Sequence, residues 1–192
     1  MYDDKPRTSS RPSLLTVYLN DHLTGSGAGV RLIYRIADRH RPKGSWPELA
    51  ALAGQIEEDQ QSLRRIMHDL DVPVRRLREV VGRIGEKAGR LKPNGRLLSR
   101  SPLSDVLELE AMLLGVEGKA ACWRALRALA ATDTRLDASD LDRLLARADA
   151  QSRSLEDLRR CCAVEALTAE PAAVSARPVR RAVAPAGRPG TT

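Results

Sequence analysis

Apolar residues recur every three or four positions through four long stretches of this chain, and this helical spacing limits the fold more than any other feature. Each stretch has about 26 to 30 residues, enough for a helix of roughly 40 to 45 Å at 1.5 Å per residue. Short connectors at 41–44 and 133–136 favour antiparallel hairpins, so we expect two hairpins. The predicted helices span Ser13–Arg39, Ser45–Leu70, Pro102–Thr132 and Ser139–Leu167.

A fifth and shorter segment, Pro73–Leu91, separates the two predicted hairpins. It is more basic and less regularly apolar than the others, and the helix-stop signal Lys92-Pro93-Asn94-Gly95 follows it. Together with the loop 93–100 it makes a long link. Two long hairpins joined in this way predict an all-α, up-down four-helix bundle with an extra helix in the crossover, because a plain up-down bundle would not need so long a middle connection.

The ends of the chain differ in composition from its middle. Residues 1–12 are polar and contain no apolar stretch, so we predict no signal peptide. Residues 168–192 are rich in Pro, Ala and Arg, which is typical of a disordered tail. The helical bundle is therefore expected to occupy 13–167. No window approaches the roughly 18 apolar residues of a membrane span, and we expect a cytoplasmic protein.

The net charge of +7 is distributed unevenly along the chain. Residues from Thr168 onward carry +3 and residues 1–12 carry +1, which leaves +3 for the predicted bundle. A modest charge without interleaved aromatic residues does not predict a specific nucleic-acid interface. The basic tail could still contact anionic surfaces nonspecifically.

Several polar residues fall on helix faces that are otherwise apolar. Ionised groups are rarely buried unless they are paired or bind a metal, and several of them at mid-helix in one bundle are typical of a metal site. His22 lies on the apolar face of the first predicted helix, and Asp59 lies on that of the second. Glu110 and Glu117 lie at the centre of the face that we assign to Leu103, Val106, Leu107, Leu113 and Leu114.

The carboxylates and the histidine also have a plainer interpretation. Glu110 and Glu117 could form ion pairs with Arg124, or with Arg159 from the last predicted helix. His22 could be a hydrogen-bonded core histidine. This interpretation predicts a helical scaffold without metal.

The glycine-rich run Gly25 to Gly29 could be a nucleotide-binding loop after a short strand. However, no Lys-Ser or Lys-Thr pair completes a phosphate loop, and the apolar stripe continues in phase to Ile36. We therefore expect a helix through these glycines. Gly25 and Gly29 would then permit close approach of a neighbouring helix beside His22.

The chain resembles the ferritin-like superfamily, and in particular its small stand-alone bacterial members, over most of residues 14–160. The matching stretches are YLNDHLTG, LAGQIEEDQQSLRRIM, SPLSDVLELEAMLLGVEGKAACW and LLARADAQSRSLEDL. Classical members of the superfamily are di-iron carboxylate bundles. The resemblance therefore implies a ferritin-like bundle, and such bundles often pair, so a homodimer is one expectation.

The resemblance also implies which residues would hold a metal. In the superfamily, the first and third core helices each supply a Glu, and the second and fourth each supply Glu-x-x-His. The corresponding candidates here are His22, Asp59, Glu110 and Glu117, for iron or manganese. No Glu-x-x-His occurs in this sequence, and the last helix offers only Gln151 and Ser152 at the matching depth. We expect Gln151 to hydrogen-bond across the bundle.

Two functional hypotheses follow from the sequence. The first is a ferritin-like protein with a degenerate metal site, linked to metal binding under stress. The second is a non-catalytic helical scaffold or interaction protein that has kept the fold and lost the metal. We do not predict an enzyme, because no nucleophile–base arrangement can be read from the sequence. The two hypotheses differ in whether the candidate ligands converge or pair with arginine.

Overall fold

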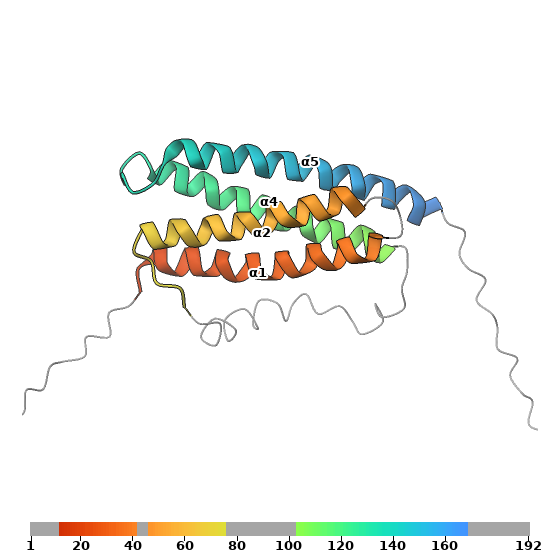
Figure 1. The fold of residues 1–192 in the computed structure, drawn as a ribbon, viewed down its shortest axis with the longest axis horizontal. Coiled ribbons are helices and arrows are strands. Elements are labelled where there is room, and N and C mark those ends of the chain that lie inside the picture. Colours follow the sequence, from red (N-terminus) through yellow and green to blue (C-terminus); the bar gives the residue numbers. More distant parts are fainter. Residues whose placement is uncertain (1–11, 42–45, 76–102, 169–192) are drawn as a thin grey trace, which may run out of the picture.

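The computed structural model describes residues 12–41, 46–75 and 103–168, and within these ranges it contains α-helices and no strand (Figure 1). The predicted all-α fold class is confirmed for this part of the chain. The helices are α1 (Leu14–His40), α2 (Trp46–Asp69), α4 (Leu103–Leu129) and α5 (Ala138–Thr168).

The helices form two antiparallel hairpins, α1 with α2 and α4 with α5 (Figure 1). Figure 1 also shows that α2 and α4 run in the same direction, so α2 ends at one end of the bundle and α4 begins at the other. The predicted crossover helix, Pro73–Leu91, lies outside the described residues except for its first three, as do the predicted tails 1–12 and 168–192 except for Pro12 and Thr168.

Side-chain caps fix where the helices begin and end. Ser13, the first residue of the predicted helix, is the N-cap of α1, and its side chain accepts a hydrogen bond from the Thr16 amide at 3.1 Å. Asp137 caps α5 in the same way, because its carboxylate accepts from the Ser139 amide at 2.8 Å. At the end of α2, Asp71 adopts a φ of 54°, and the Val72 amide bonds back to the Met67 carbonyl at 2.8 Å. These local signals set the helix lengths.

The core between the helices is built mainly from Leu, Ile, Val and Ala, as the scarcity of aromatic residues predicts. Trp123, at 1% exposure, is the largest fully buried side chain among the described residues. Other buried core side chains from the helices are Leu19, Ile33, Ile36, Leu49, Ala53, Leu63, Met67, Leu109, Met112, Leu126, Leu141 and Leu155.

The buried face of α4 differs from the predicted one. Leu103, Leu107 and Leu114 are 43%, 42% and 76% exposed, although we expected them to face the core. Apolar residues occur on almost every side of this helix, so their spacing does not select one face. Packing against the other helices selects the face that carries Val106, Leu109, Met112, Val116, Ala120, Trp123 and Leu126.

A polar cluster joins the two hairpins where α1 ends and α4 begins. Arg39 forms ion pairs with Asp105 and Glu108 on α4. The buried ring of His40 lies 3.5 Å from the Asp105 carboxylate, measured from Nε2 to Oδ2. These contacts make α1 and α4 antiparallel neighbours and set the height of one hairpin against the other.

Candidate functional site

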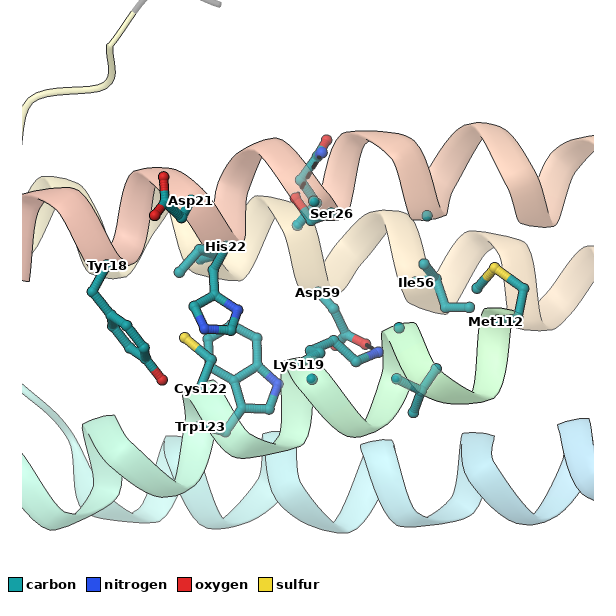
Figure 2. A pocket seen from close by; sticks show the side chains of 17 residues that line it. Tyr18, Asp21, His22, Ser26, Ile56, Asp59, Met112, Lys119, Cys122 and Trp123 are labelled. Atoms are coloured by element: carbon teal, nitrogen blue, oxygen red, sulfur yellow. Dashed lines mark hydrogen bonds and ion pairs between the residues drawn. The ribbon is translucent and has the colours of Figure 1, made fainter. Parts of the chain in front are cut away.

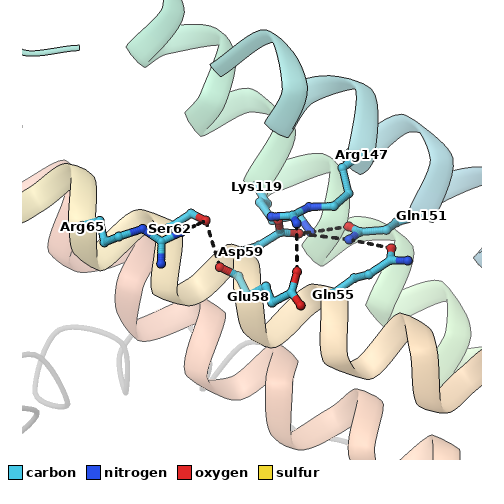
Figure 3. A network of polar contacts seen from close by, with 8 residues as sticks. All are labelled: Gln55, Glu58, Asp59, Ser62, Arg65, Lys119, Arg147 and Gln151. Atoms are coloured by element: carbon cyan, nitrogen blue, oxygen red, sulfur yellow. Dashed lines mark hydrogen bonds and ion pairs between the residues drawn. The ribbon is translucent and has the colours of Figure 1, made fainter. Parts of the chain in front are cut away.

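The most deeply buried carboxylate among the described residues is Asp59, at 1% exposure in the middle of α2. Lys119 of α4 places its Nζ 2.5 Å from Asp59 Oδ2. From α5, Gln151 donates to the same oxygen at 3.0 Å, and Arg147 forms an ion pair with Oδ1. Figure 3 shows these side chains converging from α4 and α5 on Asp59 of α2. One carboxylate thus holds α2, α4 and α5 together.

The partners of Asp59 are themselves connected. Lys119 also donates to the Gln151 side-chain oxygen at 2.5 Å, so Gln151 accepts from the lysine and donates to the carboxylate. The predicted hydrogen bonding of Gln151 across the bundle is confirmed. Arg147 reaches outward to Glu58 at 3.0 Å. The network therefore runs from the core to the surface between α2 and α5, as Figure 3 shows.

Burial sets the protonation behaviour of the lysine in this network. Lys119 is 15% exposed at its side chain, and burial lowers its pKa below the ordinary value of 10.5. The Asp59 charge raises the pKa again in part, and the Arg147 charge lowers it further. Buried charges of this kind persist when they are paired and hydrogen-bonded. Asp59 and Lys119 meet both conditions.

A cavity of about 470 Å³ lies beside the network, between α1, α2 and α4. Asp59 and Lys119 line one part of it, and His22 and Tyr18 line another. Figure 2 shows the His22 ring projecting from α1 towards α4, near Cys122 and Trp123. The cavity therefore brings together residues from three helices, and most of its wall is apolar.

The groups around His22 show what chemistry the cavity offers. The rings of Tyr18 and His22 meet edge to face, with their centroids 4.6 Å apart. Burial lowers the pKa of His22 below 6.5 and so favours the neutral ring, although the Asp21 charge opposes this in part. Burial raises the pKa of the Cys122 thiol to about 12, which makes it a packing group and a poor nucleophile.

The glycines of α1 do not have the role that we expected. A Cβ added to Gly25 or Gly29 would meet no atom within 4 Å outside its own helix, and the same holds for Gly115 and Gly118 on α4. The prediction that Gly25 and Gly29 allow close helix approach is therefore wrong. α1 does run through them as one helix, which confirms the helical interpretation of this segment.

Two of the four predicted metal ligands lie at the cavity and two do not. His22 and Asp59 line the same cavity. Glu117 is 66% exposed at its side chain and pairs with Arg124, and Glu110 is 46% exposed and lies 3.5 Å from Arg159. The expectation that Glu110 and Glu117 occupy the centre of the buried face is wrong, because that face of α4 is rotated away from them.

The two arginine pairs that we considered as the alternative are present, Glu117 with Arg124 and Glu110 with Arg159, but on the outside of the bundle. Within the described ranges, no three side chains of His, Cys, Asp or Glu lie close enough together to hold a metal ion. Iron or manganese binding stays a prediction from the sequence.

Sequence reasoning missed Lys119 and Arg147, the cations that contact Asp59. Both lie at helical spacing on the inner faces of their helices, Lys119 between Val116 and Trp123, and Arg147 between Leu144 and Gln151. Knowing which face of α4 is buried would have placed Lys119 beside the core. The spacing of Lys119 relative to Val116 and Trp123 is visible in the sequence, but apolar residues on all sides of α4 prevent the spacing from identifying the buried face.

The chain was compared with known proteins at the level of family, sequence and structure. No family model, no curated protein and no solved structure matches it. None of the described helices has the length and apolar character needed to cross a membrane.

Proposed function

We propose that this protein is a non-catalytic helical scaffold of the ferritin-like type, in which lysine and arginine neutralise the carboxylate at mid-bundle in place of a metal ion. The observation that carries the proposal is the contact of Asp59 with Lys119 and Arg147. The homodimer and the cytoplasmic location remain predictions of the same sequence argument.

The helix directions support the ferritin-like part of the proposal. Two antiparallel hairpins whose second and third core helices run parallel need one long connection between them. A single long crossover is the feature that distinguishes ferritin-like bundles from plain up-down bundles. Residues 70–102 provide a connection of the required length in this chain.

The charges around Asp59 support the scaffold over a metal carrier. A divalent cation at Asp59 would have to displace the Lys119 ammonium and the Arg147 guanidinium, or remain beside them against electrostatic repulsion. The carboxylate oxygens already receive hydrogen bonds or ion pairs from three side chains. A metal would therefore exchange existing contacts for new ones and gain little.

The metal hypothesis has weaker support among the described residues. His22 and Asp59 share a cavity, but Glu110 and Glu117 pair with arginines at the surface. Binding through all four residues would require α4 to rotate about its axis and break its buried face. We therefore favour the scaffold and use metal binding as the outcome that would overturn it.

Elemental analysis of the purified full-length protein tests the proposal directly. The protein is incubated with ferrous iron, manganese or zinc, passed through a desalting column and analysed, beside the variants Asp59→Asn and Glu110→Ala. We expect much less than one metal ion per chain in every sample. Asp142→Asn is the control, because Asp142 forms an exposed pair with Arg127 and neither residue lines the cavity. One metal per chain in the wild type, lost in Asp59→Asn and retained in Asp142→Asn, would contradict the proposal.

A further inference from the structure

The cavity between α1, α2 and α4 is lined by glycines at positions where residues with larger side chains would fill part of its volume. Its volume of about 470 Å³ falls within the roughly 300 to 1,000 Å³ typical of small-molecule sites. Gly25 and Gly29 line it from α1, and Gly115 and Gly118 line it from α4. Glycine is an unfavourable residue inside a helix, and alanine would fit at each position. The glycines therefore widen the cavity at a cost to the helices.

Aromatic residues gather at this cavity although the chain has few of them. Aromatic residues make up 3% of the sequence, and Phe is absent. Tyr18 and Trp123 nevertheless both line the cavity, together with the imidazole of His22. Rings in such a wall favour edge-to-face or stacked contacts with another ring. This wall suits a flat aromatic molecule.

One buried hydrogen-bond donor in the cavity wall lacks an acceptor within the part of the chain that the structure describes. Trp123 is 1% exposed, and its indole N–H has no partner among the described residues. Figure 2 shows the nitrogen edge of this ring turned towards the end of the cavity where Asp59 and Lys119 lie. A buried donor without an acceptor is unfavourable, so an oxygen acceptor arriving there would be stabilised.

The charges at that end of the cavity are already balanced. Lys119 has three N–H donors, of which Asp59 and Gln151 accept two. Asp59 and Glu58 supply two negative charges against the two cations, Lys119 and Arg147. An uncharged oxygen could accept from Trp123 without disturbing these ion pairs, whereas a ligand carboxylate would compete with Asp59 for Lys119.

We infer that this cavity binds an uncharged aromatic molecule that carries a carbonyl or hydroxyl oxygen. The aromatic body lies between the glycines of α1 and α4, against Tyr18 and His22. The oxygen accepts a hydrogen bond from the Trp123 indole. This site is independent of the proposal for Asp59, because it needs neither metal nor the absence of metal.

Nuclear magnetic resonance of the full-length protein tests the site with three probes, acetylnaphthalene, naphthalene and naphthoate. The first carries a neutral oxygen, the second has no oxygen, and the third carries a charge. We expect acetylnaphthalene to shift the Trp123 indole N–H signal in a saturable way. Naphthalene and naphthoate should bind at least about tenfold more weakly, since each fails to supply a neutral acceptor.

Variants of two matched glycines locate the binding. Gly115→Leu places a large side chain in the cavity, and we expect it to weaken acetylnaphthalene binding by about tenfold or more. Gly54→Leu is the control, because Gly54 also lies in a helix with no atom within 4 Å of an added Cβ but does not line the cavity. If Gly115→Leu does not fold by circular dichroism, Gly25→Leu narrows the cavity from α1 instead.

Three results would overturn the inference. The first is the absence of a saturable shift of the Trp123 signal with any of the three probes. The second is an equal loss of binding in Gly54→Leu and in the cavity variant, which would place the probe elsewhere. Equal affinity for naphthalene and acetylnaphthalene is the third, since it would remove the role of the oxygen.

Discussion

The two sides of Asp59 differ sharply. Towards α5, Arg147 and Gln151 contact the carboxylate, and Lys119 is bonded both to it and to Gln151. Towards α1, the same region borders a cavity of about 470 Å³ lined by glycines and aromatic rings. One side is held by charged contacts and the other is loosely filled. At the height of Asp59, charged contacts therefore join α2, α4 and α5, and the space for a ligand lies beside α1.

At this height of the bundle, the network side of Asp59 contributes to stability and the cavity side offers space for binding. Removing a partner on the network side leaves an uncompensated buried charge, which strongly destabilises a protein. Adding atoms on the cavity side meets open space. Substitutions on the two sides should therefore change stability in opposite directions.

The largest effect is expected on the network side, from Asp59→Ala. This change leaves Lys119 and Arg147 facing each other without their shared carboxylate. We expect the free energy of unfolding to fall by about 3 to 5 kcal/mol, measured by urea denaturation with circular dichroism. A loss below about 1 kcal/mol would show that the network is solvated and contributes little.

The opposite sign is expected on the cavity side, from Gly115→Ala. The added Cβ meets no atom within 4 Å, and alanine is a better helix residue than glycine. Stability should rise by about 0.5 to 1 kcal/mol in the same denaturation assay. Gly27→Ala is a useful comparison, because its Cβ would lie in ordinary van der Waals contact, 3.5 Å from the Gln60 amide nitrogen, and its gain should be similar. Destabilisation by Gly115→Ala would mean that α1 and α4 approach more closely there.

A smaller, pH-dependent effect is expected from His22. Its folded-state pKa lies below 6.5, so as the pH falls through 6.5 the unfolded chain takes up a proton before the folded protein does. Stability is therefore lost on acidification below pH 6.5, until the folded-state pKa is reached. Urea midpoints at about pH 7.5 and about pH 5 should differ less in His22→Gln than in the wild type. If the urea midpoints of both proteins depend on pH identically, the His22 side chain is exposed to solvent in the folded protein.

The smallest effect is expected outside both regions, at the exposed pair of Glu117 and Arg124. Its side chains are 66% and 51% exposed, so water screens the interaction. Glu117→Ala should change the free energy of unfolding by no more than about 0.5 kcal/mol. A loss comparable to that of Asp59→Ala would indicate that Glu117 is buried in the core, as the metal hypothesis requires.

Sequence periodicity predicted α1 and α2 better than α4 for a physical reason. In α2, apolar residues are sparse, so Ile56 and Leu63 define one face and Asp59 falls on it, as the structure confirms. In α4, apolar residues surround the helix, and the burial of Val116 and Trp123 depends on packing that the spacing does not encode. The helices and their order could be read from the sequence, whereas the rotation of α4 could not.

The partners of Asp59 could not be predicted for the same reason. Contacts between α2, α4 and α5 depend on the rotation of each helix and on the height of one hairpin against the other. A buried lysine is also a rare choice, so a search of inner faces for acids and histidines passes over it. The glycines gave a further signal, but their spacing fits close packing and an open cavity equally well.

A double-mutant cycle between Asp59 and Lys119 tests the central claim most directly, that protein cations neutralise the mid-bundle carboxylate. Urea denaturation in the presence of a chelator gives the stability of the wild type, Asp59→Asn, Lys119→Met and the double variant. We predict that the double variant loses less stability than the sum of the two single variants, with a coupling of about 1 to 3 kcal/mol. Additivity within about 0.5 kcal/mol would contradict the account, because it would mean that the lysine does not balance the carboxylate.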